Sequence, residues 1–129
     1  MYHLTPFFLG QEITLYPQLP RDRAIFEMAK IKRICVAPSI DECLWALRNT
    51  YYNRGIWHLY EVHDDFLPAI NVPDAHETNE HWILHPSPAK YKRYVTEMEA
   101  VIRITRHNNK IFGAQRTGNI NNTRLFCDV

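Results

Sequence analysis

The clearest pattern of apolar and polar positions marks a strand, a turn and a helix in the first third of the chain. Residues 34–36 form a short apolar run typical of a buried strand, and Pro38 favours a turn because proline disfavours helix at the preceding residue. Ser39 is followed three residues later by Glu42, which is the spacing of a capping box. Apolar side chains then recur at helical spacing over 40–47. The sequence therefore predicts a strand, a sharp turn and a capped helix.

Short apolar runs elsewhere predict several strands and few helices. A short helix is expected over 21–31, and a helix over 92–100 is an alternative to strand in that part of the chain. The polar segment from Arg106 is expected to be loop that closes in a short strand over 123–127. Further strands are expected over 1–5, 13–16, 56–62 and 80–85, with one or two more over 91–105. This interspersed order predicts an α+β fold with a compact, mostly antiparallel (split) β-sheet and one or two short helices.

Length and composition are those of one globular domain. The chain has 129 residues, of which 46% are hydrophobic and 22% charged. We expect a single domain over 1–129, with its core in 1–105 and a loop-rich tail in 106–129. The formal net charge of +1 gives no general attraction to nucleic acid or to an anionic membrane. No apolar run approaches the roughly 20 residues that a membrane-spanning helix needs, so no membrane partner is expected.

The three cysteines favour a reducing compartment. Cys35 falls in a predicted strand, Cys43 lies on the apolar face of the predicted helix, and Cys127 is in the tail. Buried free thiols fit this scatter better than disulfides do, so we expect a cytoplasmic protein. Nucleophilic catalysis needs a partly exposed thiolate beside a histidine, and we do not expect it of Cys35 or Cys43.

The seven histidines do not form a metal-binding pattern. His81 and His85 are four residues apart, which suits zinc on a helix, but the alternation around them indicates a strand. On a strand, positions four apart are about 13 Å distant. The ligand types at 63–65 have no defined spacing to a partner. We therefore expect no metal site and interpret 63–65 as a surface loop.

Polar residues at the ends of the predicted strands are the remaining candidates. His3 and Thr5 lie on the first strand, Arg33 opens the second core strand, Ser39 closes its turn, and Glu80 opens a late strand. Strand ends are where a sheet can present a site. Each residue also has a plain structural interpretation, such as a surface position, a helix cap or a charge at a strand edge. Their combination is what points to function.

This combination resembles the ADP-ribosyltransferase superfamily, especially its small bacterial and phage members. Their first strand carries an aromatic-His-x-Ser/Thr-Pro element, and residues 2–6 read Tyr-His-Leu-Thr-Pro. Their second core strand runs into a small or hydroxyl residue and a helix, as 34–39 does before 40–47. Their catalytic glutamate opens a late strand, as Glu80 does. The resemblance spans about residues 1–105 and implies an ADP-ribosyltransferase-like fold.

The resemblance also implies roles for these residues. NAD⁺ would be the substrate, with no metal, and would lose nicotinamide through an oxocarbenium-like transition state that a carboxylate stabilises. Only Ser39 stands where the family carries a Ser-Thr-Ser triplet, and Glu77 precedes Glu80 by three residues, which leaves the acceptor open. In that case Glu80 would be the catalytic carboxylate, His3 would bind a ribose, and Thr5 would steady His3. Arg33 would contact the pyrophosphate, and Ser39 would face the nucleotide. Tyr51, Tyr52 or Tyr60 would stack on nicotinamide.

Three classes of function are consistent with the sequence. The first is an ADP-ribosyltransferase, or an NAD glycohydrolase, of phage or prophage origin that modifies a host protein or nucleic-acid acceptor in the bacterial cytoplasm. The second is a non-catalytic phage protein that acts against a host defence system by binding a host protein or a nucleotide signal. The third is a structural protein that uses exposed aromatic residues for oligomer contacts. The oligomeric state is not set by the sequence.

Overall fold

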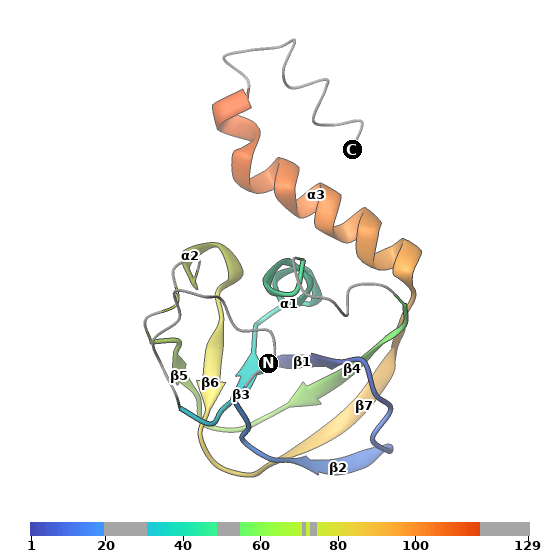
Figure 1. Cartoon of the computed structure of the whole chain (residues 1–129), viewed down its shortest axis with the longest axis vertical. Coiled ribbons are helices and arrows are strands. Elements are labelled where there is room, and N and C mark those ends of the chain that lie inside the picture. The colour runs from blue at the N-terminus through green and yellow to red at the C-terminus, as the bar shows by residue number, and fades with distance from the viewer. Residues whose placement is uncertain (20–30, 49–54, 71, 73–74, 117–129) are drawn as a thin grey trace.

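The computed structural model describes residues 1–19, 31–48, 55–70, 72 and 75–116. Residues 114–116 are described by their backbone alone. It is an α+β fold in which every strand pairing is antiparallel, as the sequence predicts at this level (Figure 1). The strands are β1 (Tyr2–Thr5), β2 (Glu12–Leu15), β3 (Ile34–Val36), β4 (Trp57–Val62), β5 (Leu67–Pro68), β6 (His81–Ile83) and β7 (Ser87–Val95), and the helices are α1 (Ile40–Ala46), α2 (Ala75–Thr78) and α3 (Glu97–Arg116).

The strands form two sheets that meet along one edge of β3. A four-stranded sheet has the order β1-β4-β7-β2, and a three-stranded sheet has the order β3-β6-β5. Two isolated backbone pairs join the sheets, Tyr2 with Ala37 and Gln18 with Arg33. The two ends of β3 are thus tied to the start of β1 and to the segment that follows β2. This places residues from the N-terminal strand beside residues of the strand–turn–helix unit.

Strand β4 lies at the centre of the hydrophobic core because both of its faces are buried. Trp57 and Leu59 pack in one cluster with residues of α1 and α3, whereas Tyr60 and Val62 pack in a second cluster with residues of β3 and β6. The pairing of β4 with β7 shifts register between Leu59 and Tyr60. No helix in the described residues is long and apolar enough to cross a bilayer.

The predicted cap of α1 is confirmed. The Ser39 hydroxyl accepts a hydrogen bond from the Glu42 backbone N–H at 3.2 Å and donates one to the Glu42 carboxylate at 2.7 Å. These contacts satisfy a backbone donor of the first turn that would otherwise have no partner. The sequence signal and the local structure therefore agree over this unit.

The interpretation of strand and loop is wrong over 97–116, whereas the alternative of a helix over 92–100 agrees with the structure at 97–100. Strand β7 ends at Val95, and α3 occupies the region where strands were expected up to 105 and loop beyond 106. The Thr96 hydroxyl accepts from the Glu99 N–H at 3.1 Å and so caps the helix. Ala100 is buried on α1, and this packing outweighs the strand preference of the β-branched residues that follow it. The expected helix over 21–31, apart from Ile31, and the expected strand over 123–127 lie outside the described residues.

Candidate functional site

Three of the residues selected from the sequence lie around Cys35 in the structure. Cys35 is the middle residue of β3 and stands opposite Trp82 of β6. His3 contacts its backbone carbonyl, and the side chains of Glu80 and Arg33 both act on its thiol. The start of the first strand is joined to the end of the second core strand, and the late strand pairs with that core strand.

Glu80 is held in place by its neighbours on both sides. Asn79 has the left-handed backbone angle φ 53°, and the Thr78 hydroxyl accepts a hydrogen bond from the Glu80 N–H at 3.3 Å. The Trp82 indole N–H donates to Glu80 Oε2 at 2.7 Å. Since Trp82 is 0% exposed, its ring has little freedom and fixes the position of the carboxylate. Glu80 as a whole residue is partly exposed.

Arg33 stacks on the same indole ring whose N–H binds the Glu80 carboxylate. Its guanidinium carbon is 4.3 Å from the centre of the Trp82 ring, and its Nη1 donates to the Ile31 carbonyl at 3.2 Å. Arg33 is only 3% exposed. A side chain so deeply buried has no free face for a pyrophosphate group, so we do not retain that role for it. Its charge lowers the pKa of the Cys35 thiol, against the effect of burial.

The Cys35 thiol is a neutral group. Burial raises its pKa to about 12, and the nearby Glu80 carboxylate also raises it, while Arg33 acts in the opposite direction. Burial likewise raises the pKa of the Cys43 thiol to about 12. Both thiols therefore stay protonated near neutral pH and are poor nucleophiles, as the sequence predicts. Cys127 lies outside the described residues.

His3 fills a gap in the hydrogen bonding along the edge of β3. Arg33 and Ala37 each pair with a neighbouring segment through both backbone groups, and Cys35 lies midway between them. The Cys35 carbonyl accepts from His3 Nδ1 at 2.8 Å. Because a carbonyl can only accept, Nδ1 carries the hydrogen and Nε2 has the lone pair. Burial lowers the pKa of His3, which the Cys35 hydrogen bond opposes, so the ring is neutral at pH 7.

Thr5 and Ser39 have structural roles. The Thr5 hydroxyl accepts from the Phe7 N–H at 3.2 Å and closes the turn after β1, and Thr5 is only 8% exposed. The Ser39 hydroxyl is used in the cap of α1. Within the described residues, the hydrogen bonds of these two hydroxyls do not involve Glu80. We place both residues in the scaffold.

Tyr60 is unsuited to stacking on a ligand. It is 0% exposed, and its hydroxyl donates to the Gly10 carbonyl at 2.8 Å and accepts from the Leu9 N–H at 2.9 Å. These bonds hold the segment that connects β1 to β2. Gly10 is suited to this position by its φ of 116°, which side-chain-bearing residues rarely adopt. The alternative stacking candidates, Tyr51 and Tyr52, lie outside the described residues.

Trp82 was not among the residues selected from the sequence. The readable signal is the spacing Glu80-x-Trp82, because residues two apart on a strand share a face. The contribution of Cys35 had no such signal, since its place beside Glu80 depends on the pairing of β3 with β6.

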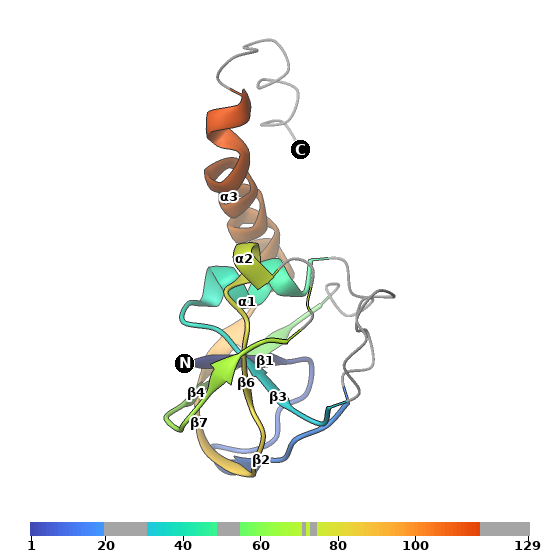
Figure 2. The ribbon, with the colours of Figure 1, turned by 90° about the vertical axis from the view of Figure 1, so that its left-hand side faces the viewer.

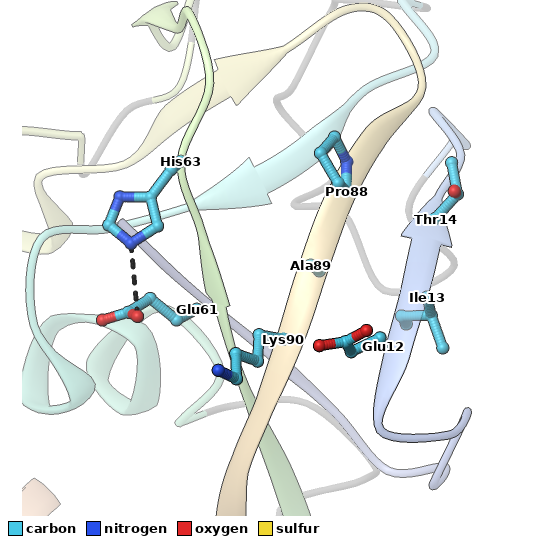
Figure 3. A pocket seen from close by; sticks show the side chains of 8 residues that line it. All are labelled: Glu12, Ile13, Thr14, Glu61, His63, Pro88, Ala89 and Lys90. Atoms are coloured by element: carbon cyan, nitrogen blue, oxygen red, sulfur yellow. Dashed lines mark ion pairs between the residues drawn. The ribbon is translucent and has the colours of Figure 1, made fainter.

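An open hollow on the larger sheet is separate from this site. It has a volume of about 470 Å³ and lies over β2, β7 and the end of β4 (Figure 3). Glu61 in it pairs with His63 at 3.2 Å and with Lys92 at 4.0 Å, and the hydrogen bond from His63 lowers the pKa of Glu61. Its charges compensate one another on an open surface. The lining residues are Glu12, Ile13, Thr14, Glu61, His63, Pro88, Ala89 and Lys90, and none was selected from the sequence.

The histidines and acidic residues are used in local contacts. His81 lies in β6, as predicted, and its Nδ1 is 2.8 Å from the Asn79 carbonyl. His85 pairs with Asp64 at 2.9 Å, and Asp64 also accepts from the Ser87 hydroxyl at 2.7 Å. Across the described ranges, no group of three or more His, Cys, Asp or Glu side chains is arranged to hold a metal ion.

Comparison with known proteins identified no relative. The chain matches no protein-family model, no curated protein and no solved structure. The function of the site is therefore argued from its residues and their geometry.

Proposed function

We propose that His3 and Glu80 form a nucleotide site at which NAD⁺ is cleaved, with ADP-ribose passing to an acceptor or to water. The observation that supports this proposal is that both residues stand beside β3: His3 donates to the Cys35 carbonyl, and Glu80 directly precedes β6, which pairs with β3. His3 lies in β1 of the four-stranded sheet and Glu80 directly precedes β6 of the three-stranded sheet, so their arrangement depends on the fold. Strand-end polar groups that meet in this way are the usual form of a site on a sheet scaffold.

Glu80 supplies the charge that the reaction needs. When the bond between nicotinamide and ribose breaks, its electron pair leaves with the nicotinamide nitrogen, and positive charge develops on the ribose ring. A carboxylate fixed beside that ring stabilises the charge without having to reorganise. Trp82 holds Oε2 of Glu80, and we assign Oε1 to the ribose. The acceptor, or water, then adds to the ribose carbon and loses its proton.

His3 supplies a hydrogen-bond acceptor. In the neutral tautomer set by the Cys35 carbonyl, Nε2 has a lone pair that can accept from a ribose hydroxyl. A protonated ring would lose this lone pair and add a positive charge beside the developing one. The lowered pKa of His3 keeps the ring in the useful form at neutral pH.

The resemblance to small phage ADP-ribosyltransferases supports the wider assignment. On that basis the acceptor is a host protein or nucleic acid, and the chain acts in the cytoplasm of a bacterial host with an ADP-ribosyltransferase-like fold. Arg33, Thr5, Ser39 and Tyr60 are assigned to the support of the site, because each is committed to contacts within the protein.

The test is cleavage of labelled NAD⁺ in the presence and absence of bacterial lysate. We expect release of nicotinamide, or transfer of label, by the wild-type chain and its loss in Glu80→Gln. Glu61→Gln is the matched control, since Glu61 is a partly buried carboxylate on the other sheet. Equal activity of wild type and Glu80→Gln would contradict the proposal, and so would absence of any turnover.

Binding without chemistry is the second candidate, and the buried Arg33 favours it. Arg33 is engaged with Trp82 and with the Ile31 carbonyl, so the cluster offers a hydrogen-bond acceptor and a carboxylate, which suit the hydroxyls of a nucleoside signal better than the pyrophosphate of NAD⁺. Calorimetric titration with NAD⁺ and other nucleotides separates the two candidates. Binding that is weakened by His3→Asn, together with no turnover, would support a protein that sequesters a nucleotide signal.

A further inference from the structure

The peptide group between Asn79 and Glu80 is held by side chains at both of its polar atoms. The Thr78 hydroxyl accepts from the Glu80 N–H at 3.3 Å, and His81 Nδ1 lies 2.8 Å from the Asn79 carbonyl. Because a carbonyl can only accept, His81 Nδ1 carries the hydrogen and donates it. A peptide group is planar and moves as one unit. Thr78 and His81, which we call the peptide clamp, therefore hold the whole unit that leads into Glu80.

The two side chains of the peptide clamp are themselves packed in place. Thr78, the last residue of α2, is 1% exposed. His81 lies in β6 opposite Pro68 of β5, and its ring meets the ring of Phe66 edge-on, with 5.1 Å between the ring centres. Side chains that are packed in this way lose little further freedom when they form a hydrogen bond. The clamp can therefore fix the peptide group between residues 79 and 80.

The backbone on both sides of Glu80 is also fixed by hydrogen bonds. Asn79 has a φ of 53°, a left-handed angle that asparagine adopts more readily than most residues, and its N–H donates to the Ala75 carbonyl at 2.8 Å. This bond closes α2, which lies at the start of β6 in Figures 1 and 2. The Glu80 carbonyl accepts from the Ala69 N–H at 3.2 Å. Because both peptide groups that flank the Cα of Glu80 are held, its Cα–Cβ bond has one direction.

We propose that Thr78 and His81 are positioning residues, whose clamp on this peptide group aims the Glu80 side chain at Trp82. The Trp82 indole N–H then holds the carboxylate at 2.7 Å, so the side chain of Glu80 is fixed at its stem and at its end. A group that is ordered before a ligand arrives loses less freedom when the ligand binds or reacts. For its effect on turnover this inference rests on the proposed function, whereas the effect of the clamp on the bond between Glu80 and Trp82 does not.

The nuclear magnetic resonance signal of the Trp82 indole N–H, in the isotope-labelled full chain, tests the clamp without any turnover. Trp82→Phe assigns the signal, and Glu80→Ala marks its position when the bond to the carboxylate is lost. Thr78→Val keeps the shape of the side chain and removes the acceptor. We expect Thr78→Val to move the signal at least about half of the way to the Glu80→Ala position. Thr78→Ser keeps the hydroxyl and should leave the signal near its wild-type position.

His81→Leu removes the other half of the clamp and should move the signal in the same way. His81→Asn keeps a side-chain N–H near the position of Nδ1 and should restore it. Thr5→Val is the matched control for the signal, because the buried Thr5 hydroxyl also accepts a backbone N–H two residues ahead, that of Phe7 at 3.2 Å. Circular dichroism checks that each variant keeps the fold. A signal that stays in place in Thr78→Val or in His81→Leu, or that moves as far in Thr5→Val, overturns the proposal.

Turnover gives a second readout of the clamp. Thr78→Val and His81→Leu should each lower kcat for nicotinamide release about tenfold and change KM less than about twofold, because a positioning residue does not touch substrate. Thr78→Ser and His81→Asn should keep kcat within about threefold of the wild-type value. A wild-type chain without turnover contradicts the proposed function alone, and the Trp82 signal then decides on the clamp. An active wild-type chain whose kcat is unchanged by Thr78→Val and His81→Leu overturns the clamp.

Discussion

Glu80 and Glu99 are both partly buried carboxylates fixed by hydrogen bonds, but their partners differ in charge. Glu99 accepts two bonds of 2.8 Å from Arg93 and a third of 2.8 Å from Arg103. Glu80 accepts a bond of 2.7 Å from the neutral indole of Trp82. A carboxylate between two guanidinium groups has its charge compensated within the protein. The neutral indole of Trp82 fixes the position of the Glu80 carboxylate without itself neutralising the charge.

The surroundings of the two carboxylates reinforce this contrast. The hydrogen bond from Arg93 lowers the pKa of Glu99 to about 2, in spite of partial burial, and Arg103 also pairs with Asp41 at 2.9 Å. This network lies at the surface, where ion pairs contribute little to stability. The partner of Glu80 is fully buried. We therefore expect changes at the Glu80 cluster to affect both folding and function, and changes at the Glu99 network to affect neither strongly.

Removal of the indole is expected to have the largest effect. Trp82 is 0% exposed, so Trp82→Ala leaves a cavity and should lower the free energy of unfolding by about 3–5 kcal/mol. Denaturant unfolding followed by circular dichroism measures this change. Tyr94→Ala is the control, because Tyr94 is 58% exposed and its loss should cost no more than about 0.5 kcal/mol. Equal costs for the two variants would contradict the burial of Trp82.

Removal of the indole N–H alone should have a smaller, more specific effect. Trp82→Phe keeps most of the ring, and loss of the bond to Glu80 should lower the free energy of unfolding by about 1–3 kcal/mol. Under the proposed function, kcat for nicotinamide release should fall while KM changes little, because Trp82 positions Glu80 and does not touch substrate. Steady-state kinetics at saturating NAD⁺ measure this split.

Trp57→Phe is the matched control for that experiment. Trp57 is 2% exposed, and its indole nitrogen has no hydrogen-bond partner among the described residues. Its replacement removes a buried N–H that holds nothing in place. A fall in kcat for Trp57→Phe as large as that for Trp82→Phe would mean that the indole effect is general, and that Trp82 does not position Glu80.

The two capped helices show which parts of the fold could be read from the sequence. The capping pair Ser39 and Glu42 predicts the start of α1. Thr96 and Glu99 have the same spacing, and Thr96 caps α3. The second helix was missed because Val101 and its β-branched neighbours favour strand by local preference. What overrides this preference is the packing of Ala100 on α1, a contact between segments far apart in the chain. Capping signals within one helix can be recognised in the sequence, whereas packing between distant segments cannot.

The same limit applies to the candidate site. Short motifs selected His3, Arg33 and Glu80, and the structure brings them to Cys35. No local pattern indicated that Arg33 would be buried against an aromatic ring, or that Tyr60 would hold a loop instead of facing a ligand. Both facts depend on which strands pair and in which register. A motif can therefore select candidate residues, but their roles follow from their neighbours.

The pH dependence of stability should distinguish the two regions. Burial lowers the pKa of His3, against the hydrogen bond to Cys35, whereas an unfolded histidine titrates near about 6.5. The unfolded chain therefore binds more protons as pH falls below about 6.5, and the free energy of unfolding should decrease from there. The contribution of Glu99, whose folded pKa is about 2, is present above its ordinary pKa and is lost progressively as pH falls from there to about 2.

Denaturant midpoints at a series of pH values test this prediction. His3→Asn should weaken the decrease between about pH 7 and pH 5, because the variant has no ring to protonate there. His63→Asn is the control, since the His63 side chain is 79% exposed. A profile that His3→Asn leaves unchanged would show that another group causes the loss of stability in mild acid.

Neutralisation of Glu99 should have the smallest effect. Glu99→Gln removes the charge that Arg93 and Arg103 share, and because the network is at the surface we expect a loss of less than about 1 kcal/mol in the free energy of unfolding. The loss should shrink further in high salt, which screens exposed charges. Denaturant unfolding at low and high sodium chloride measures both quantities. If Glu99→Gln cost as much as Trp82→Phe, at any salt concentration, then a surface ion pair and the buried indole hydrogen bond would contribute equally to stability in this fold. The argument that singles out Glu80 would then fail.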